Sequence, residues 1–78
     1  MSRLPSLSSR KIIKALVRAG FSEAPDRGKG SHRAFVKTEP GLPPRLTIVP
    51  QGKDIPRGTL LSILEQAGLS RDEFLGLL

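Results

Sequence analysis

A proline-rich segment in the middle of the chain, Thr38 to Pro44 (TEPGLPP), cannot continue a β-ladder, because proline has no backbone N–H to donate. One β-prone run precedes this segment, Ser31 to Lys37, and another follows it, Arg45 to Val49. Two strands joined by one loop are expected to pair in an antiparallel way. Phe21 to Ala24 is a candidate for a further short strand, and the turn-forming residues 25–30 separate it from the next run.

A stretch with helical periodicity, Arg10 to Ala19, comes before the β-prone centre. Ser8 or Ser9 can cap this helix, because a serine oxygen can accept hydrogen bonds from the free N–H groups of the first turn. Gly20 can end it, since glycine adopts the left-handed conformation at little cost. The apolar side chains fall on one side, with Val17 at the margin; they are Ile12, Ile13, Leu16 and Ala19.

A second helix is expected to begin at Gly58-Thr59 and to end at Gly68. Four apolar side chains at helical spacing form its buried stripe: Leu60, Ile63, Leu64 and Ala67. Beyond it, Ser70 and Glu73 match a capping box, which predicts a short C-terminal helix. The expected anchors of that helix are Phe74, Leu77 and Leu78.

The order of these elements predicts an α+β fold, α-β-β-β-α with a short extra C-terminal helix. Two helices packed on one face of a three-stranded antiparallel sheet bury the apolar stripes economically. A chain of 78 residues has room for one domain, so residues 1–78 are expected to form a single domain.

The absence of cysteine favours a reducing compartment, because a secreted domain of this size usually needs disulfides. No apolar run reaches the length of a membrane span, and residues 1–9 contain no hydrophobic stretch of signal-peptide length. We therefore expect a cytoplasmic protein without a membrane partner.

Positive charge dominates most of the chain. Residues 1–57 carry twelve basic and four acidic side chains, whereas residues 58–78 carry one basic and three acidic ones. The net charge of +6 favours a polyanionic partner such as nucleic acid. The competing interpretation is an ordinary solvated surface.

His32 is the one histidine of the chain, and it follows the glycine-containing segment Gly28 to Ser31. Histidine can take and give protons near neutral pH, and Lys29 and Arg33 could hold a phosphate beside it. This grouping suits cleavage of a phosphodiester. In a regular strand, however, His32 and Arg33 point to opposite faces. If Phe35 faces the core, His32 is exposed; if Val36 does, His32 lies at the edge of the core and can be purely structural.

The polar face of the first helix carries Lys11, Lys14 and Arg18. These side chains are candidates for contacts with RNA phosphates or with an acidic partner, although an exposed helix face is commonly just solvated. With three Phe and no Tyr or Trp, the chain offers few platforms for stacked bases, so recognition of RNA backbone and shape is favoured.

No metal site is expected. The acidic residues are scattered, and a single histidine without cysteine leaves no zinc ligand set. No cofactor is expected either, because the Gly28 to Ser31 segment lacks the full spacing of a phosphate-binding loop.

Taken together, these motifs resemble the HicA toxins, which are small RNA-cleaving partners of type II toxin–antitoxin pairs. Four segments match in order across most of residues 8–75; they are the end of the first helix at Arg18-Ala19-Gly20-Phe21, Lys29 to Phe35, Arg45 to Pro50, and the second helix from Ile55 to Leu69.

The resemblance implies a fold like that of a double-stranded-RNA-binding domain. It also implies an mRNA interferase, an endoribonuclease that needs no metal and is neutralised by a HicB-type antitoxin. His32 would be the catalytic residue. Contacts to RNA or its phosphates would come from Lys29, Gly30, Ser31, Arg33, Lys11 and Lys14.

Two features depart from the family pattern. Many members carry a second histidine directly after the first, but here that position is Arg33. His32 would then act alone or with help from Lys29, Arg33 or water. In addition, the loop Thr38 to Pro44 is longer and richer in proline than the usual tight turn.

The residues leave other functions open. A non-catalytic double-stranded-RNA-binding module would have the same fold and charge. A protein-interaction domain with a basic docking face is a third hypothesis, supported by charge alone. The attacking group, a ribose 2′-hydroxyl or water, is also left open, as are the RNA sequence preference and the oligomeric state.

Overall fold

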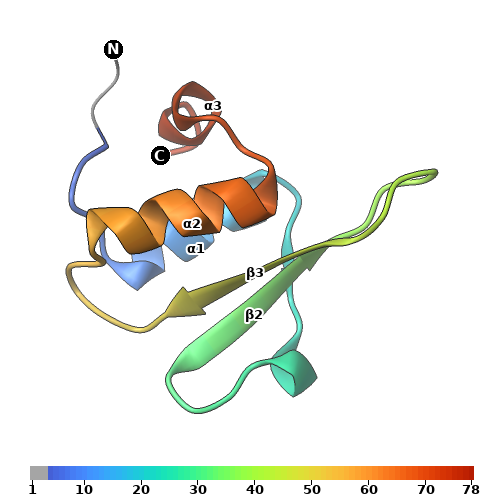
Figure 1. The fold of residues 1–78 in the computed structure, drawn as a ribbon, viewed down its shortest axis with the longest axis horizontal. Coiled ribbons are helices and arrows are strands. Elements are labelled where there is room, and N and C mark those ends of the chain that lie inside the picture. The colour runs from blue at the N-terminus through green and yellow to red at the C-terminus, as the bar shows by residue number, and fades with distance from the viewer. Residues whose placement is uncertain (1–3) are drawn as a thin grey trace.

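The computed structural model describes residues 4–78 and confirms the predicted α+β fold (Figure 1). Helix bounds differ from the expected ones by a residue or so, and a short 3₁₀-helix, η1, lies within the predicted turn 25–30. The elements are α1 Ser9–Arg18, β1 Ser22–Glu23, η1 Pro25–Arg27, β2 His32–Lys37, β3 Arg45–Pro50, α2 Arg57–Ala67 and α3 Arg71–Leu75.

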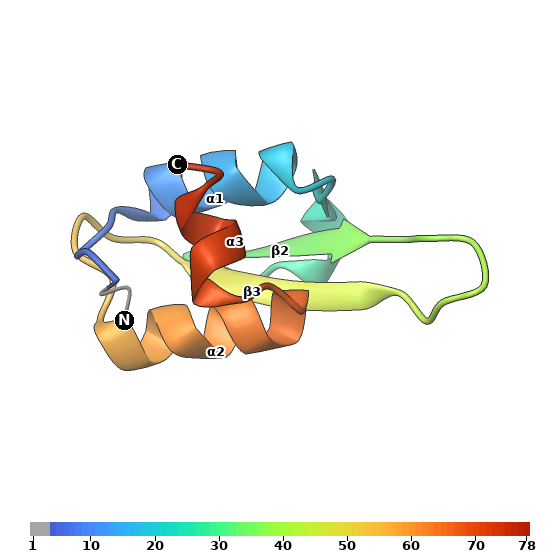
Figure 2. The ribbon, with the colours of Figure 1, turned by 90° about the horizontal axis from the view of Figure 1, so that it is seen from above.

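The sheet has the order β1-β2-β3, and both pairings are antiparallel. In the longer pairing, His32 lies opposite Pro50 and Lys37 lies opposite Arg45. The proline-rich residues 38–44 form the connecting loop, which projects from the body of the molecule (Figures 1 and 2).

Helices α1 and α2 lie on one face of the sheet, and α3 lies across them on the side away from the strands (Figures 1 and 2). The buried side chains of these helices form one apolar cluster with Phe35 and Val49 of the sheet. Phe74 of α3 is 0% exposed and belongs to the same cluster. The short third helix therefore closes the core, as a thin domain requires.

The predicted helix ends are confirmed by specific caps. The Ser8 side chain accepts from the backbone N–H of Lys11, and Ser70 forms the expected capping box with Glu73. Gly20 and Gly68 follow α1 and α2 with positive φ, which glycine tolerates best.

The buried stripe of α2 contains all four predicted residues, and α1 buries Ile12, Ala15 and Leu16. Leu78 is 46% exposed, so its prediction as an anchor of the C-terminal helix is wrong; the chain has already left α3 there. The core also includes three side chains that helical periodicity did not find, because they lie outside the helices: Leu4, Leu7 and Ile55.

The free edge of β3 is partly closed by a side chain from α2. The backbone N–H of Gln51 donates to the carbonyl of Ser31, just before β2. Because N–H groups point alternately to the two sides of a strand, the backbone nitrogens of Ile48 and Pro50 point away from β2. The Ile48 N–H donates to Oε1 of Gln66 over 3.4 Å, and the same oxygen accepts from the buried Thr47 hydroxyl at 2.9 Å. Pro50 has no N–H, so β3 includes it without loss of a ladder bond.

No helix among residues 4–78 is both long enough and apolar enough to span a lipid bilayer.

Candidate active site

A tight turn brings His32 to the start of β2. The backbone N–H of Lys29 donates to the carbonyl of His32, and the N–H of His32 donates back to Lys29, both at 3.0 Å. Gly30 has φ 59°, so the first central position of this turn is left-handed, as in a type II′ hairpin turn. The turn therefore fixes the backbone of His32 before the strand begins.

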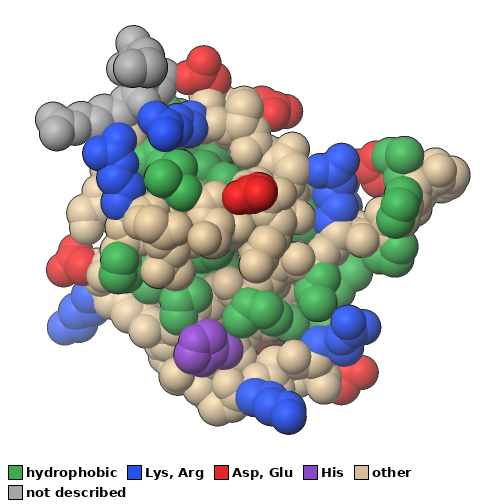
Figure 3. All heavy atoms as spheres, viewed as in Figure 1, with side chains coloured by type: hydrophobic (Ala, Val, Ile, Leu, Met, Phe, Trp, Pro, Cys, Tyr) green, Lys and Arg blue, Asp and Glu red, His purple; other side chains and the backbone are tan. Residues whose placement is uncertain are grey.

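The imidazole lies on the outer face of the sheet, away from the helices. Phe35 is 1% exposed and packs in the core, so strand alternation places His32 on the opposite face, where it is exposed. Figure 3 shows the one histidine of the chain beside a band of hydrophobic side chains. The outer-face pairs adjacent to it are Ala34 with Ile48 and Val36 with Leu46, and Pro50 lies directly opposite His32.

Lys29 and Ser31 are the predicted site residues that the structure places with His32. Lys29 and His32 are paired across the turn, and directly paired residues project their side chains to the same face. The Ser31 hydroxyl lies 3.5 Å from Nδ1 of His32. The site therefore joins a group that can exchange protons with a cation that can offset negative charge on a phosphate.

Arg33 lies on the other face of the sheet, with Phe35. Its Nε and Nη2 atoms donate to the two carboxylate oxygens of Glu23 at 2.8 and 2.6 Å. This bidentate hydrogen bonding lowers the pKa of Glu23 and raises the pKa of Arg33. The guanidinium also lies over the ring of Phe35, 5.7 Å from its centroid. Arg33 therefore does not flank the imidazole, and its charge is already matched by Glu23.

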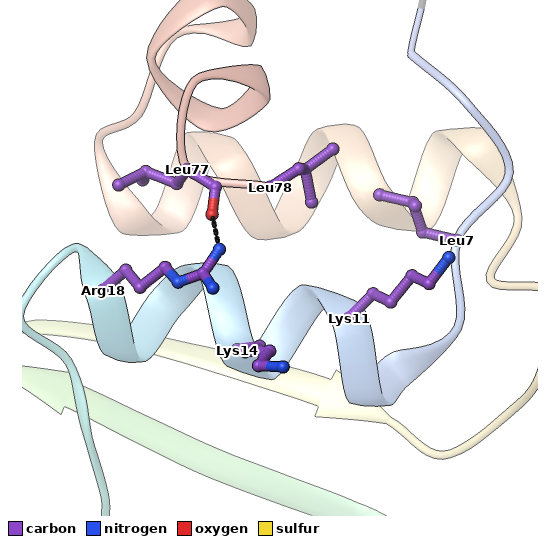
Figure 4. Close-up of a pocket in the computed structure, with 6 residues that line it drawn as sticks. All are labelled: Leu7, Lys11, Lys14, Arg18, Leu77 and Leu78. Atoms are coloured by element: carbon purple, nitrogen blue, oxygen red, sulfur yellow. Dashed lines mark hydrogen bonds between the residues drawn. The ribbon is translucent and has the colours of Figure 1, made fainter.

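Lys11 and Lys14 line a groove between α1 and the C-terminal segment (Figure 4). This groove is on the helix side of the molecule, whereas His32 is on the outer face of the sheet. The structure thus separates these two lysines from the candidate catalytic residue by a helix and a sheet.

Gly28 positions the site, a role that no local pattern in the sequence predicts. A Cβ atom at Gly28 would lie 2.8 Å from the His32 carbonyl oxygen and 3.3 Å from the Ala34 nitrogen. Only glycine lets residues 24–28 pack this closely on β2, where Ala24 also donates to Ala34. Ala34 is buried as a result.

Glu23 is a second residue near the site that sequence patterns did not predict. It precedes Arg33 by ten residues, and only the register of β1 against β2 brings the two charges together. Opposite charges on two neighbouring predicted strands could have suggested this ion pair. The sequence alone did not give the register that places Glu23 beside Arg33.

Among residues 4–78, no group of three histidine or acidic side chains lies close enough together to hold a metal ion.

Fold and site together define a class of protein. The chain is a small α+β domain of the double-stranded-RNA-binding type, with a short extra C-terminal helix and an exposed histidine at the start of its second strand. A family model described as "HicA toxin of bacterial toxin-antitoxin" matches residues 9–69, well over half of the chain. The chain therefore belongs to the HicA toxin family. Among curated proteins, no match was found.

Membership of this family makes the protein the toxin of a toxin–antitoxin pair. The family implies an RNA substrate and a cognate HicB antitoxin.

Proposed function

We propose that the protein is an mRNA interferase, an endoribonuclease in which His32 is the catalytic residue. The observation that carries this proposal is the pairing of an exposed imidazole with Lys29 on the same face of a tight turn. No packing role accounts for His32, because its ring faces solvent.

In the proposed reaction, the imidazole of His32 removes a proton from the attacking hydroxyl. A new P–O bond forms, the bond from phosphorus to the 5′ oxygen breaks, and the leaving oxygen takes up a proton from water, from Lys29 or from the imidazolium just formed. Since the Ser31 hydroxyl lies beside Nδ1, Nε2 is the nitrogen left for this transfer. Lys29 would stabilise the negative charge that gathers on the phosphate oxygens.

Gly30 and Ser31 would let the RNA backbone approach the turn, because neither carries a large side chain. We place Arg33 in a separate contact. It lines a groove with Arg10 and Pro50 at the same end of the sheet, where a neighbouring phosphate on the helix side would compete with Glu23 for its guanidinium. An RNA bound at His32 would have to wrap around the molecule to reach Lys11 and Lys14, which lie on the far side of α1.

We further infer that residues 1–78 act as one domain, that the toxin works in the cytoplasm where mRNA is present, and that a HicB-type antitoxin neutralises it. The reaction as proposed requires neither a metal nor a cofactor.

The test is a cleavage assay on end-labelled RNA in the presence of EDTA, comparing the wild type with His32→Ala and Asp26→Ala. Asp26 is an exposed side chain of η1 and serves as a control. We expect the wild type and Asp26→Ala to cut, and His32→Ala to lose at least about 100-fold in rate. Circular dichroism should show the same fold for all three, because the His32 ring is not packed. Equal cutting by His32→Ala would refute the proposal.

The chemistry of the product ends distinguishes the two attacking groups. Attack by the ribose 2′-hydroxyl leaves a cyclic phosphate and requires that hydroxyl, so a single deoxy substitution at the cut site abolishes cleavage. Attack by water tolerates the substitution.

A non-catalytic double-stranded-RNA-binding module is the second candidate, and the fold itself favours it. In that case none of the three proteins cuts, and His32→Ala binds duplex RNA with the affinity and salt dependence of the wild type.

A further inference from the structure

The groove between α1 and the C-terminal segment is a surface that the proposed cleavage does not use. It has a volume of about 300 Å³ and is lined by Leu7, Lys11, Lys14, Arg18, Leu77 and Leu78. Figure 4 shows the three leucines on the side of the N-terminal and C-terminal segments and the three cations along α1. We call this surface the α1 groove.

The α1 groove combines an apolar wall with a row of positive charge. Leu78 is 46% exposed, so a large apolar side chain there faces solvent. Lys11 and Lys14 are exposed, and within residues 4–78 neither has an ion-pair partner. Arg18 is held in place, because its Nη1 donates to the Leu77 carbonyl at 2.7 Å.

This combination is a poor surface for RNA. A surface that binds the RNA backbone needs cations alone, whereas half of this groove is lined by leucines, which offer nothing to a phosphate. The groove matches the apolar face of an amphipathic helix, whose side chains at i, i+3, i+4 and i+7 fill hydrophobic grooves. Carboxylates beside that face would meet the row of cations, so charge complementarity selects an acidic segment.

We propose that the α1 groove is a docking site for an acidic, amphipathic helical segment of a protein partner. Its apolar side chains pack on Leu77 and Leu78, above the buried Leu7, and its carboxylates pair with Lys11 and Lys14. The proposal does not depend on RNA cleavage, because the groove and His32 lie on opposite sides of the molecule.

The experiment is a fluorescence-anisotropy titration with a labelled helical peptide of roughly four turns, with Leu at i, i+3, i+4 and i+7 and Glu at the flanking positions. A second peptide has the same composition in an order that disperses the leucines, and a third replaces Glu by Gln. The proteins are the wild type, the double variant Lys11→Glu/Lys14→Glu, Leu78→Ser, and Arg27→Glu, which reverses one charge in η1 and serves as a control away from the groove. All four are checked for an unchanged fold.

The proposal requires saturable binding of the first peptide to the wild type and to Arg27→Glu, with weaker binding at high salt. The double lysine variant should bind about tenfold more weakly or worse, Leu78→Ser should also lose affinity, and the dispersed and Gln peptides should bind poorly.

Three results would overturn the proposal. One is no saturable binding of the first peptide up to about 1 mM. Another is equal affinity for the wild type and the double lysine variant. The third is displacement of the peptide by an RNA duplex whose own affinity falls in the double lysine variant, which would assign the groove to nucleic acid.

Discussion

At the scale of single residues, the two basic neighbours of His32 have different surroundings. Lys29 shares a face with the imidazole, whereas Arg33 is on the other face and is bound to Glu23. We therefore expect Lys29→Ala to slow RNA cleavage about tenfold or more, because a cation is lost near the scissile phosphate. Arg33→Ala should change the cleavage step little and act mainly on RNA affinity. Single-turnover rates at saturating RNA measure the difference, and a larger loss in Arg33→Ala would contradict this site.

Gly28 and Gly30 offer a matched pair of substitutions around the same turn. Gly28→Ala puts a Cβ 2.8 Å from a backbone oxygen of β2, so the segment must move; we expect a loss of about 1–3 kcal/mol in the free energy of unfolding and slower cleavage. Gly30→Ala meets no atom within 4 Å and carries only the strain of its positive φ, about 1 kcal/mol. Urea unfolding of both variants measures which one loses more free energy of unfolding. A larger loss in Gly30→Ala than in Gly28→Ala would contradict this account of the turn.

Side-chain orientations on β2 show what sequence patterns can and cannot predict. Alternation placed His32 and Arg33 on opposite faces from the sequence alone, but whether Phe35 or Val36 faced the core depended on how the helices pack. The role of Gly28 was out of reach for a related reason. It depends on residues 24–28 lying against β2, which is a contact between segments rather than a local preference.

At the scale of elements, α3 is stabilised by its capping box. Hydrogen bonds from Ser70, with smaller effects of Arg45 and Lys37, lower the pKa of Glu73 below its usual 4.5. A lowered carboxyl pKa stabilises the fold above the usual pKa, and this stability is lost as the pH falls through the folded pKa.

Glu73→Gln keeps an acceptor for the Ser70 N–H but cannot ionise. We expect the wild type to be more stable than this variant near neutral pH and the gap to shrink below the usual carboxyl pKa of 4.5. Urea midpoints near pH 7 and about pH 3 measure the gap. A gap that stays constant would mean that the charge of Glu73 does not stabilise α3.

The elements themselves were the most predictable part of the structure. Caps at Ser8 and Ser70 and left-handed glycines at positions 20 and 68 are local signals, and each marks a helix end in the structure. Core residues outside the helices were missed because they are fixed by distant pairing; Leu7, for example, forms an isolated antiparallel bridge with Ile55.

At the scale of the whole molecule, the α1 groove and His32 face opposite directions. Saturating the groove with the acidic peptide should therefore leave the rate of RNA cleavage within about twofold of the free protein, since the peptide does not reach the imidazole. The cleavage assay with and without peptide measures this. Strong inhibition by the peptide, absent in Lys11→Glu/Lys14→Glu, would show that the two surfaces are coupled.

The topology also explains why the predicted RNA-contacting residues divide into separate groups. Lys11 and Lys14 are only about twenty residues from His32 in the chain, yet α1 and β2 belong to different layers. The sequence does not show in which layer of the fold each cation lies. Only the packed structure therefore shows which cations can contact the same phosphate.

The edge of β3 limits how other chains can join this protein. A strand that added itself to the sheet there would find no donor at Pro50 and a donor already engaged with Gln66 at Ile48. Growth of the sheet from copy to copy through this edge is thereby discouraged. A partner that binds at this edge must therefore contact side chains rather than extend the sheet by backbone pairing.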